Sequence, residues 1–228
     1  MKIGAAVPVY NRERFIGPYL EMLLEFGVKP VVTLGERPWA DFIPHEGPPD
    51  RTEFILNKFF PDIHVIKGIF SHQKDSINQA IIRGLGGTDL RIVNDCDMFI
   101  TRKDWDEFIK FVETNPSYEV YSINFERMII EYVYDYRFGK GAIRGGDPPI
   151  VAMKPPVELK HMTKTTCDNE LVWDVDGPKY HHMRFCQKGR VNSKSEPTSE
   201  NSNINDYKPA PEEISNRLKK WETILETL

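Results

Sequence analysis

The sequence predicts an α/β fold in which helices flank a mostly parallel central sheet, followed by a smaller β region and a C-terminal helix. Short apolar runs alternate with segments of helical periodicity over the first half of the chain, as in sheets with right-handed crossovers. The first run, residues 3–9, is continuously apolar, which is typical of a strand buried on both faces. The alternation ends near residue 114, and residues 120–136 are rich in Tyr, Ile, Val and Phe, which favours strand pairing.

The individual elements follow in a regular order. After the first strand, four apolar residues recur at helical spacing from Phe15 to Phe26, and Gly27 ends that helix. Residues 38–50 are rich in Pro and Gly and should form a loop. The expected strands are 3–9, 30–34, 63–67, 89–94 and 150–153, and the expected helices are 15–26, 51–59, 75–85 and 105–114.

The last part of the chain predicts an amphipathic helix that needs an apolar partner. Its apolar positions are Ile214, Leu218, Trp221, Leu225 and Leu228. We expect this helix to fold back on its own domain; the alternative is a subunit interface that makes a homo-oligomer. The expected organisation is one main α/β domain over 1–187, a polar linker or surface arm over 188–211 and the helix over 212–228.

Composition excludes several classes of protein. The 228 residues carry a net charge of −4, which argues against a general electrostatic grip on nucleic acid. No stretch approaches the length of an apolar membrane span, and Met1-Lys2 leads directly into a strand, so we expect a soluble, cytoplasmic protein. Cys96, Cys167 and Cys186 form an odd set without regular spacing, which suits a reducing compartment. A zinc site built from Cys167, His182 and Cys186 is an alternative that lacks a fourth ligand.

Asp95-Cys96-Asp97 is the strongest chemical signal, because it closes the expected strand 89–94. Two carboxylates one residue apart at a strand end can act on one hard cation, and oxygen ligands are those that Mg²⁺ or Mn²⁺ select. The alternative is a polar turn that leaves the strand.

Two further strand ends carry polar residues. Pro8, Tyr10 and Asn11 end the first strand, and Gly35-Glu36 end the second. Ligands of open α/β sheets bind outside the carboxyl ends of the strands. An aromatic ring there can stack on a base and an amide can read its edge, while Arg12 and Arg14 could reach phosphates. An ordinary strand-to-helix turn is the alternative.

These motifs together resemble glycosyltransferases of the GT-A fold, particularly glycosyltransferase family 2. Residues 3–12 resemble the opening strand of that family, residues 74–80 resemble the helix before its metal strand, and Asp95-Cys96-Asp97 matches its DxD motif. Residues 167–171 resemble the acidic motif that starts the acceptor-site helix, and His181-His182 lie where several such enzymes have a histidine. The resemblance covers about residues 1–186. The second strand departs from the family pattern, because it ends in Gly35-Glu36-Arg37 where the family has an acidic pair.

The resemblance implies the roles of the site residues. It implies Mn²⁺ or Mg²⁺ as cofactor, held by Asp95, Asp97 and His182, with His181 as the alternative histidine. Within this set Asp97 would be the direct ligand, and Asp95 would contact ribose or a metal-bound water. Asp168 or Glu170 would be the general base; the alternative is an acidic helix start with Asp168 as N-cap. The residues expected to bind the donor are Pro8, Tyr10, Asn11, Arg12, Glu36, Lys74, Asn78 and Asp95.

The sequence therefore predicts a metal-dependent glycosyltransferase that moves a sugar from a nucleoside-diphosphate sugar, first a UDP-sugar, to a hydroxyl acceptor. We expect the acceptor to be a saccharide and the reaction to invert the anomeric centre. One alternative is a non-catalytic nucleotide- or carbohydrate-binding module on the same scaffold. Another is a nucleotidyltransferase, although the glycine-rich loop of sugar-phosphate nucleotidyltransferases is absent after the first strand.

Overall fold

The computed structural model of the chain describes residues 1–37, 50–123, 131–135, 140–144, 150–161, 164–167, 169–173, 180–182 and 210–228. The expected loop 38–50 and the expected arm 188–211 lie outside this part of the chain, except for residues 50, 210 and 211. The division into 1–187, 188–211 and 212–228 stays a prediction.

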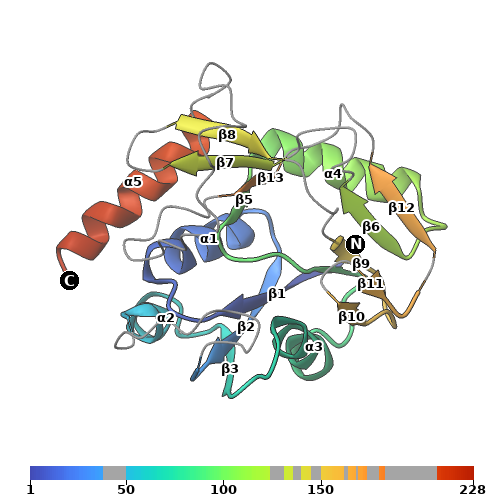
Figure 1. Cartoon of the computed structure of the whole chain (residues 1–228), viewed down its shortest axis with the longest axis horizontal. Helices are drawn as coiled ribbons and strands as arrows, with labels where there is room; N and C mark the ends of the chain where they lie inside the picture. Colours follow the sequence, from blue (N-terminus) through green and yellow to red (C-terminus); the bar gives the residue numbers. More distant parts are fainter. Residues whose placement is uncertain are drawn as a thin grey trace.

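A mixed sheet forms the centre of the molecule (Figure 1). Within the described ranges it has seven strands, which lie side by side in the order β12 (Glu170–Trp173), β6 (Val120–Ile123), β9 (Ile150–Met153), β4 (Leu90–Ile92), β1 (Ile3–Val9), β2 (Lys29–Gly35) and β3 (His64–Gly68). Strand β1 pairs in parallel with β2 and β4, β2 with β3, and β12 with β6. Strand β9 is antiparallel to both of its neighbours. The predicted α/β class with a mostly parallel sheet is confirmed.

Helices cover both faces of this sheet. Their bounds are α1 (Glu13–Glu25), α2 (Thr52–Phe59), α3 (Gln73–Gly84), α4 (Arg102–Thr114) and α5 (Glu212–Glu226). Residues of α1, α2, α4 and α5 belong to one core cluster, and those of α3 belong to a second cluster on the other face. In Figure 1, α1 accordingly lies above β1 and α3 below it. The helix positions agree with those expected from the apolar periodicity to within a few residues.

Helix α1 ends as its sequence predicts. Gly27 adopts a left-handed φ of 71°, which glycine reaches without a Cβ clash. Its N–H donates to the Leu24 carbonyl at 3.0 Å, and the Val28 N–H donates to the Leu23 carbonyl at 2.9 Å. These two bonds form a Schellman motif that satisfies the last carbonyls of the helix and turns the chain into β2.

A smaller β region follows the Asp95–Asp97 segment. Its strands are ordered β5 (Met98–Ile100), β13 (Tyr180–His182), β7 (Glu131–Asp135) and β8 (Lys140–Arg144), and a separate hairpin consists of β10 (Leu159–His161) and β11 (Lys164–Thr165). Strand β5 begins directly after Asp97, so this second sheet is anchored next to the expected metal motif. The predicted β region beyond the parallel sheet is confirmed.

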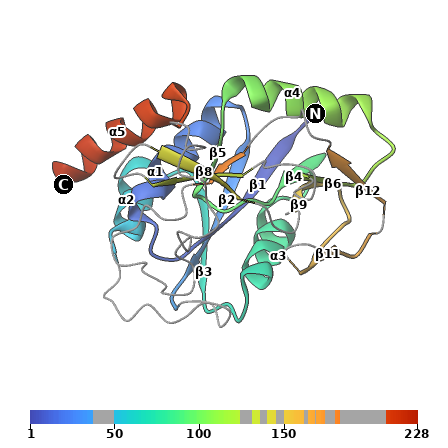
Figure 2. The ribbon, with the colours of Figure 1, turned by 45° about the horizontal axis from the view of Figure 1, so that its top comes forward.

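Helix α5 folds back onto α1 and α2, as expected from its apolar stripe (Figure 2). A Cβ on Gly17 would come within 2.3 Å of the Trp221 ring, so only glycine allows this close approach. The same ring stacks on Phe60 and meets Phe59 edge to face. Its Nε1–H donates to Glu21 Oε2 at 3.0 Å. The apolar face of α5 is therefore used inside the domain.

The acidic segment 167–171 does not start a helix. Glu170 begins β12, which pairs in parallel with β6 through the register Glu170↔Val120 to Trp173↔Ile123. The run Leu171-Val172-Trp173 is apolar and rich in residues that favour strands, and it extends the sheet. The expected acceptor-site helix and the alternative of a helix cap at Asp168 are both wrong at this point.

In the described part of the chain, no helix is long and apolar enough to cross a membrane.

Candidate functional site

The polar residues expected at the strand ends do meet at one edge of the sheet. Strands β1, β2 and β4 run parallel, so Tyr10, Glu36 and Asp95 all follow carboxyl ends of neighbouring strands. Tyr10 and Asp95 are partly exposed and Glu36 is exposed, whereas Pro8 is buried inside β1. This is the edge at which open α/β sheets bind ligands.

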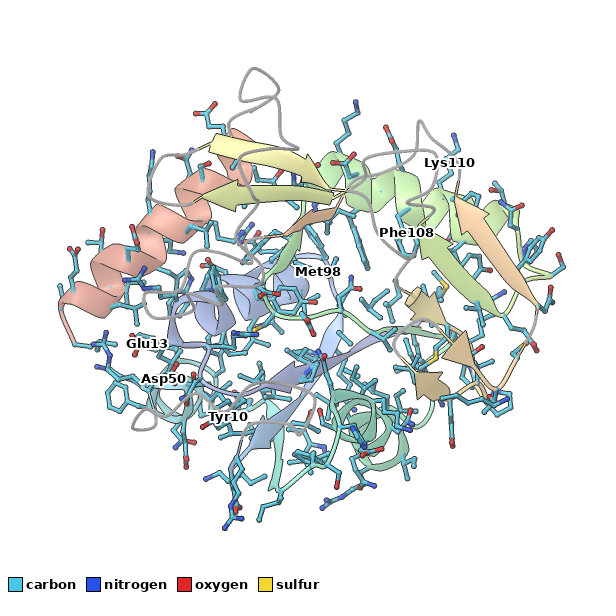
Figure 3. The ribbon with its side chains drawn as sticks, viewed as in Figure 1. Tyr10, Glu13, Asp50, Met98, Phe108 and Lys110 are labelled. Atoms are coloured by element: carbon cyan, nitrogen blue, oxygen red, sulfur yellow. The ribbon has the colours of Figure 1, made fainter. Side chains whose placement is uncertain are left out.

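The turn after β1 has an uncommon backbone conformation that neighbouring residues stabilise. Asn11 has a left-handed φ of 48°, which costs a non-glycine residue about 1 kcal/mol or more. The Asp50 N–H donates to Asn11 Oδ1 at 3.3 Å, and Asp50 Oδ2 accepts from the Glu13 N–H at 2.9 Å. The Arg12 N–H donates to Thr52 Oγ1 at 2.7 Å. Figure 3 shows Glu13 and Asp50 side by side where α1 and α2 begin.

Arg12 is the next residue of this turn and is only 5% exposed. Its Nη2 is 3.9 Å from Asp97 Oδ2. Burial on its own lowers the pKa of the guanidinium, but nearby ionisable groups outweigh burial and raise this pKa above its ordinary value. In decreasing order of effect, these groups are Asp97, Cys96, Asp95 and Asp50.

The two aspartates of the DxD motif have different surroundings. Asp97 is 1% exposed and faces Arg12, while Asp95 is partly exposed. The side-chain amide of Gln73 donates to Asp95 Oδ1. Gln73 is the first residue of α3, and the dipole of a helix makes its N-terminus favourable for anions. Asp95 is thus the accessible carboxylate of the pair.

Asn94 brings a buried amide to the same segment. Its side chain is 2% exposed, and within the described ranges neither amide atom has a hydrogen-bond partner. Such a group is costly to bury unless water or a ligand meets it.

Two donor-site predictions on α3 have different outcomes. Lys74 is partly exposed in the first turn, near Gln73 and the edge that carries Asp95. Asn78 instead contacts β10: its Nδ2 donates to the Leu159 carbonyl at 2.9 Å, and its Oδ1 accepts from the Leu159 N–H at 3.1 Å. The structure thus gives Asn78 a structural contact that docks the β10–β11 hairpin on α3.

The histidine pair lies on β13, which is antiparallel to β5. His182 is paired in register with Met98, so its backbone is next to the Asp97 segment. His181 is 5% exposed, and its Nε2 is 3.9 Å from Asp104 Oδ2 on α4. The structure therefore brings the backbone of His182, and not the ring of His181, toward the expected metal motif.

Of the two expected catalytic acids, Glu170 is placed by the structure and does not join this edge. Asp168 lies outside the described residues. Glu170 starts β12, three strands away from β4, which corresponds to about 14 Å across the sheet. The register aligns Glu170 with Val120 and, through β9, with Arg91, which precedes Asp95. Glu170 is therefore remote from Asp95 in both directions.

Some residues of the site were not expected from the sequence. Gln73 contacts Asp95, and Asp50 and Thr52 hold the turn after β1. Asp50-Arg51-Thr52 before a helical segment is a capping signal, and Asp50 Oδ1 does accept from the Thr52 N–H at 2.9 Å. That signal locates the start of α2 but says nothing of its contact with Asn11. In the part of the chain that the structure describes, no group of three His, Cys, Asp or Glu side chains could hold a metal ion.

No family model and no curated protein matches this sequence. Among solved structures, TarS from S. aureus aligns over 80% of this chain and 36% of its own, with a TM-score of 0.50 and 13% identity. The 1–349 form of TarS aligns over 80% of this chain and 60% of its own, with a TM-score of 0.48 and 14% identity. A synthetase of CMP:2-keto-3-deoxy-manno-octonic acid, in complex with CTP, aligns over 81% of this chain and 72% of its own, with a TM-score of 0.40 and 11% identity.

The likeness to TarS concerns the fold, which is GT-A-like, and so confirms the expected fold class. The chain spans about a third of the length of the first TarS structure and 60% of the 1–349 form. Membership of glycosyltransferase family 2 stays a prediction.

Proposed function

We propose that this chain is a glycosyltransferase that binds a nucleoside-diphosphate sugar at the carboxyl edge of β1, β2 and β4. The observation that carries the proposal is Asp95, a partly exposed carboxylate at the end of a central strand. Around it lie the first turn of α3 and the buried Arg12. The GT-A-like fold and the resemblance of the strand-end motifs support this choice of ligand.

Tyr10, Asn11 and Glu36 are the proposed contacts to the nucleoside. Tyr10 and Asn11 are partly exposed after β1 and Glu36 is exposed after β2, so all three can reach a ligand at this edge. An aromatic ring stacks on any base, and a carboxylate accepts hydrogen bonds from ribose hydroxyls. UDP is the first nucleotide to test, because TarS has been solved in complex with UDP.

The charge balance of the site is compatible with a divalent cation. Asp50, Asp95 and Asp97 influence Arg12 together, so carboxylates outnumber guanidinium groups there. Asp95 would hold Mg²⁺ or Mn²⁺, and His182 is the candidate second protein ligand from the neighbouring strand β13. Such an ion stabilises the negative charge of a departing diphosphate. Asp97 contributes through Arg12, whose buried positive charge it balances and which it holds in position.

Proton removal from the acceptor needs a carboxylate near the sugar. The resemblance implies Asp168 as that base, and Asp168 lies outside the described residues. An inverting displacement and a saccharide acceptor complete the proposal. Asp168→Asn should retain nucleotide binding and lose transfer; normal turnover by this variant would remove Asp168 from the mechanism.

The decisive experiment is calorimetric titration of the protein with UDP, GDP, CDP and CTP, each with Mn²⁺ and with EDTA. Binding of a nucleoside diphosphate that strengthens with Mn²⁺, followed by slow hydrolysis of the matching sugar donor, supports the transferase. Binding without hydrolysis or transfer would indicate a binding module. A preference for CTP with release of pyrophosphate would indicate a nucleotidyltransferase.

A further inference from the structure

We propose that Asp50 and Arg51 are positioning residues for this nucleotide site, and that through Arg51 the C-terminal helix α5 stabilises the strained turn after β1. The inference rests on the proposed function, because the turn contains Asn11 and Arg12, which belong to the proposed site.

The turn after β1 depends on residues 50–52. Asn11 lies in a costly region of backbone space, and such residues persist only where the surroundings fix them. Five hydrogen bonds among the described residues join residues 11–13 to residues 50–52, and the bond to Arg12 is buried. The start of α2 is therefore the template for this turn.

Arg51 connects the start of α2 to both α1 and α5. Its backbone N–H and its Nε–H both donate to Glu13 Oε2, at 3.1 and 3.2 Å. Its Nη1 donates to the Leu225 carbonyl at 2.9 Å. Leu225 lies in the last turn of α5, where carbonyls lack partners within the helix and a cation is favourable.

The bonds of Arg51 affect the turn after β1 more than they affect global stability. The Arg51 and Glu13 side chains are 42% and 30% exposed, so their ion pair adds little to global stability. The bonds to Glu13 and Leu225 instead fix Arg51 from two sides, and residue 51 lies between Asp50 and Thr52, which contact the turn. Loss of the Arg51 side chain should therefore loosen the turn more than it destabilises the fold.

Arg102 offers a matched control. Its Nη2 donates to the Glu25 carbonyl at 2.6 Å, and its backbone N–H donates to Glu213 at the start of α5. Arg102 is exposed, like Arg51, and its side chain also makes a charge-assisted bond to a carbonyl in the last turn of a helix, here α1. It contacts the far end of α1, away from Asn11 and Arg12.

The test compares Arg51→Ala with Arg102→Ala in the full chain. Hydrogen exchange measured by mass spectrometry reports the amides of residues 11–16, and calorimetry measures UDP affinity in the presence of Mn²⁺. We expect faster exchange and about tenfold weaker UDP binding for Arg51→Ala, a loss typical of one or two charge-assisted bonds. Arg102→Ala should match the wild type in both. Arg51→Lys keeps the charge near Glu13 but not both contacts, so it should recover part of the affinity.

Unchanged exchange in Arg51→Ala, or faster exchange with unchanged UDP affinity, would overturn the proposal, and so would an equal loss of affinity in Arg102→Ala. If Arg51→Ala does not fold, Glu13→Gln is the second variant. It removes the negative charge that Arg51 contacts, and it is judged by the same two measurements. If the wild type binds no nucleotide, the proposed function fails, and this positioning role fails with it.

Discussion

The Arg12 guanidinium lies 3.9 Å from the Asp97 carboxylate, and both side chains are almost fully withdrawn from solvent. This pair ties the turn after β1 to the segment after β4, which are the two walls of the proposed site. A buried charge keeps its partner even where the pair itself adds little net stability, because removing one member leaves the other uncompensated.

The first prediction is that Asp97→Ala destabilises the protein. Arg12 would lose its strongest acidic neighbour, and Asp95 and Asp50 would compensate only in part. We expect a loss of about 3 kcal/mol in the free energy of unfolding, measured by urea denaturation. A loss below about 1 kcal/mol would show that the remaining carboxylates suffice to balance Arg12.

The second prediction separates Asp95 from Asp97. Asp95 is partly exposed, so Asp95→Asn should leave the melting temperature nearly unchanged. Mn²⁺-linked UDP affinity should fall about 10- to 100-fold, as measured by calorimetry. Glu170→Gln is the matched control and should bind like the wild type, since Glu170 starts a remote strand. Equal Mn²⁺-dependent affinity in Asp95→Asn would remove Asp95 from the ligand set.

The third prediction concerns Asn78. Asn78→Ala removes both bonds to the Leu159 backbone and should cost about 1–2 kcal/mol of stability. UDP affinity should stay within about twofold of the wild type, since the amide is engaged by the hairpin. A large loss of affinity with unchanged stability would return Asn78 to the donor site.

The fourth prediction is a pH dependence at the contact between α1 and α5. A hydrogen bond from Arg217, at 2.6 Å, lowers the pKa of Glu25 below its ordinary value of 4.5. The stabilisation is therefore present above pH 4.5 and is lost as pH falls through the lowered pKa. Glu25 is largely exposed, so the effect is small. Glu25→Gln should show a shallower loss of stability between pH 4.5 and 3 than the wild type; parallel curves would contradict the assignment.

The first half of the fold could be predicted because its signals are local. Continuous apolar runs mark β1 to β4, and apolar periodicity marks α1 to α4 and α5. Strand β12 could not be recognised in the same way, since its pairing with β6 joins residues about fifty positions apart in the chain. A short acidic motif was interpreted as a helix start there, and tertiary pairing decided otherwise.

The candidate site was predicted in position but not in detail. Parallel strands bring Tyr10, Glu36 and Asp95 to one edge, and this follows from strand order alone. Periodicity cannot tell that Asp97 is inside and Asp95 partly outside, because both follow the strand and only the buried Arg12 distinguishes them. Likewise, Asp50 was expected only as the end of the loop 38–50, and its bond to Asn11 depends on how α2 packs beside α1.

The hydrogen bond from Trp221 to Glu21 joins residues that are 200 positions apart in the chain. Until the segment that carries Trp221 has emerged from the ribosome, the surface of α1 around Gly17 lacks the cover that the Trp221 ring provides. Closing so long a loop adds entropy cost early and returns contacts only late, which slows folding. We therefore expect the docking of α5 on α1 to be a late step of folding.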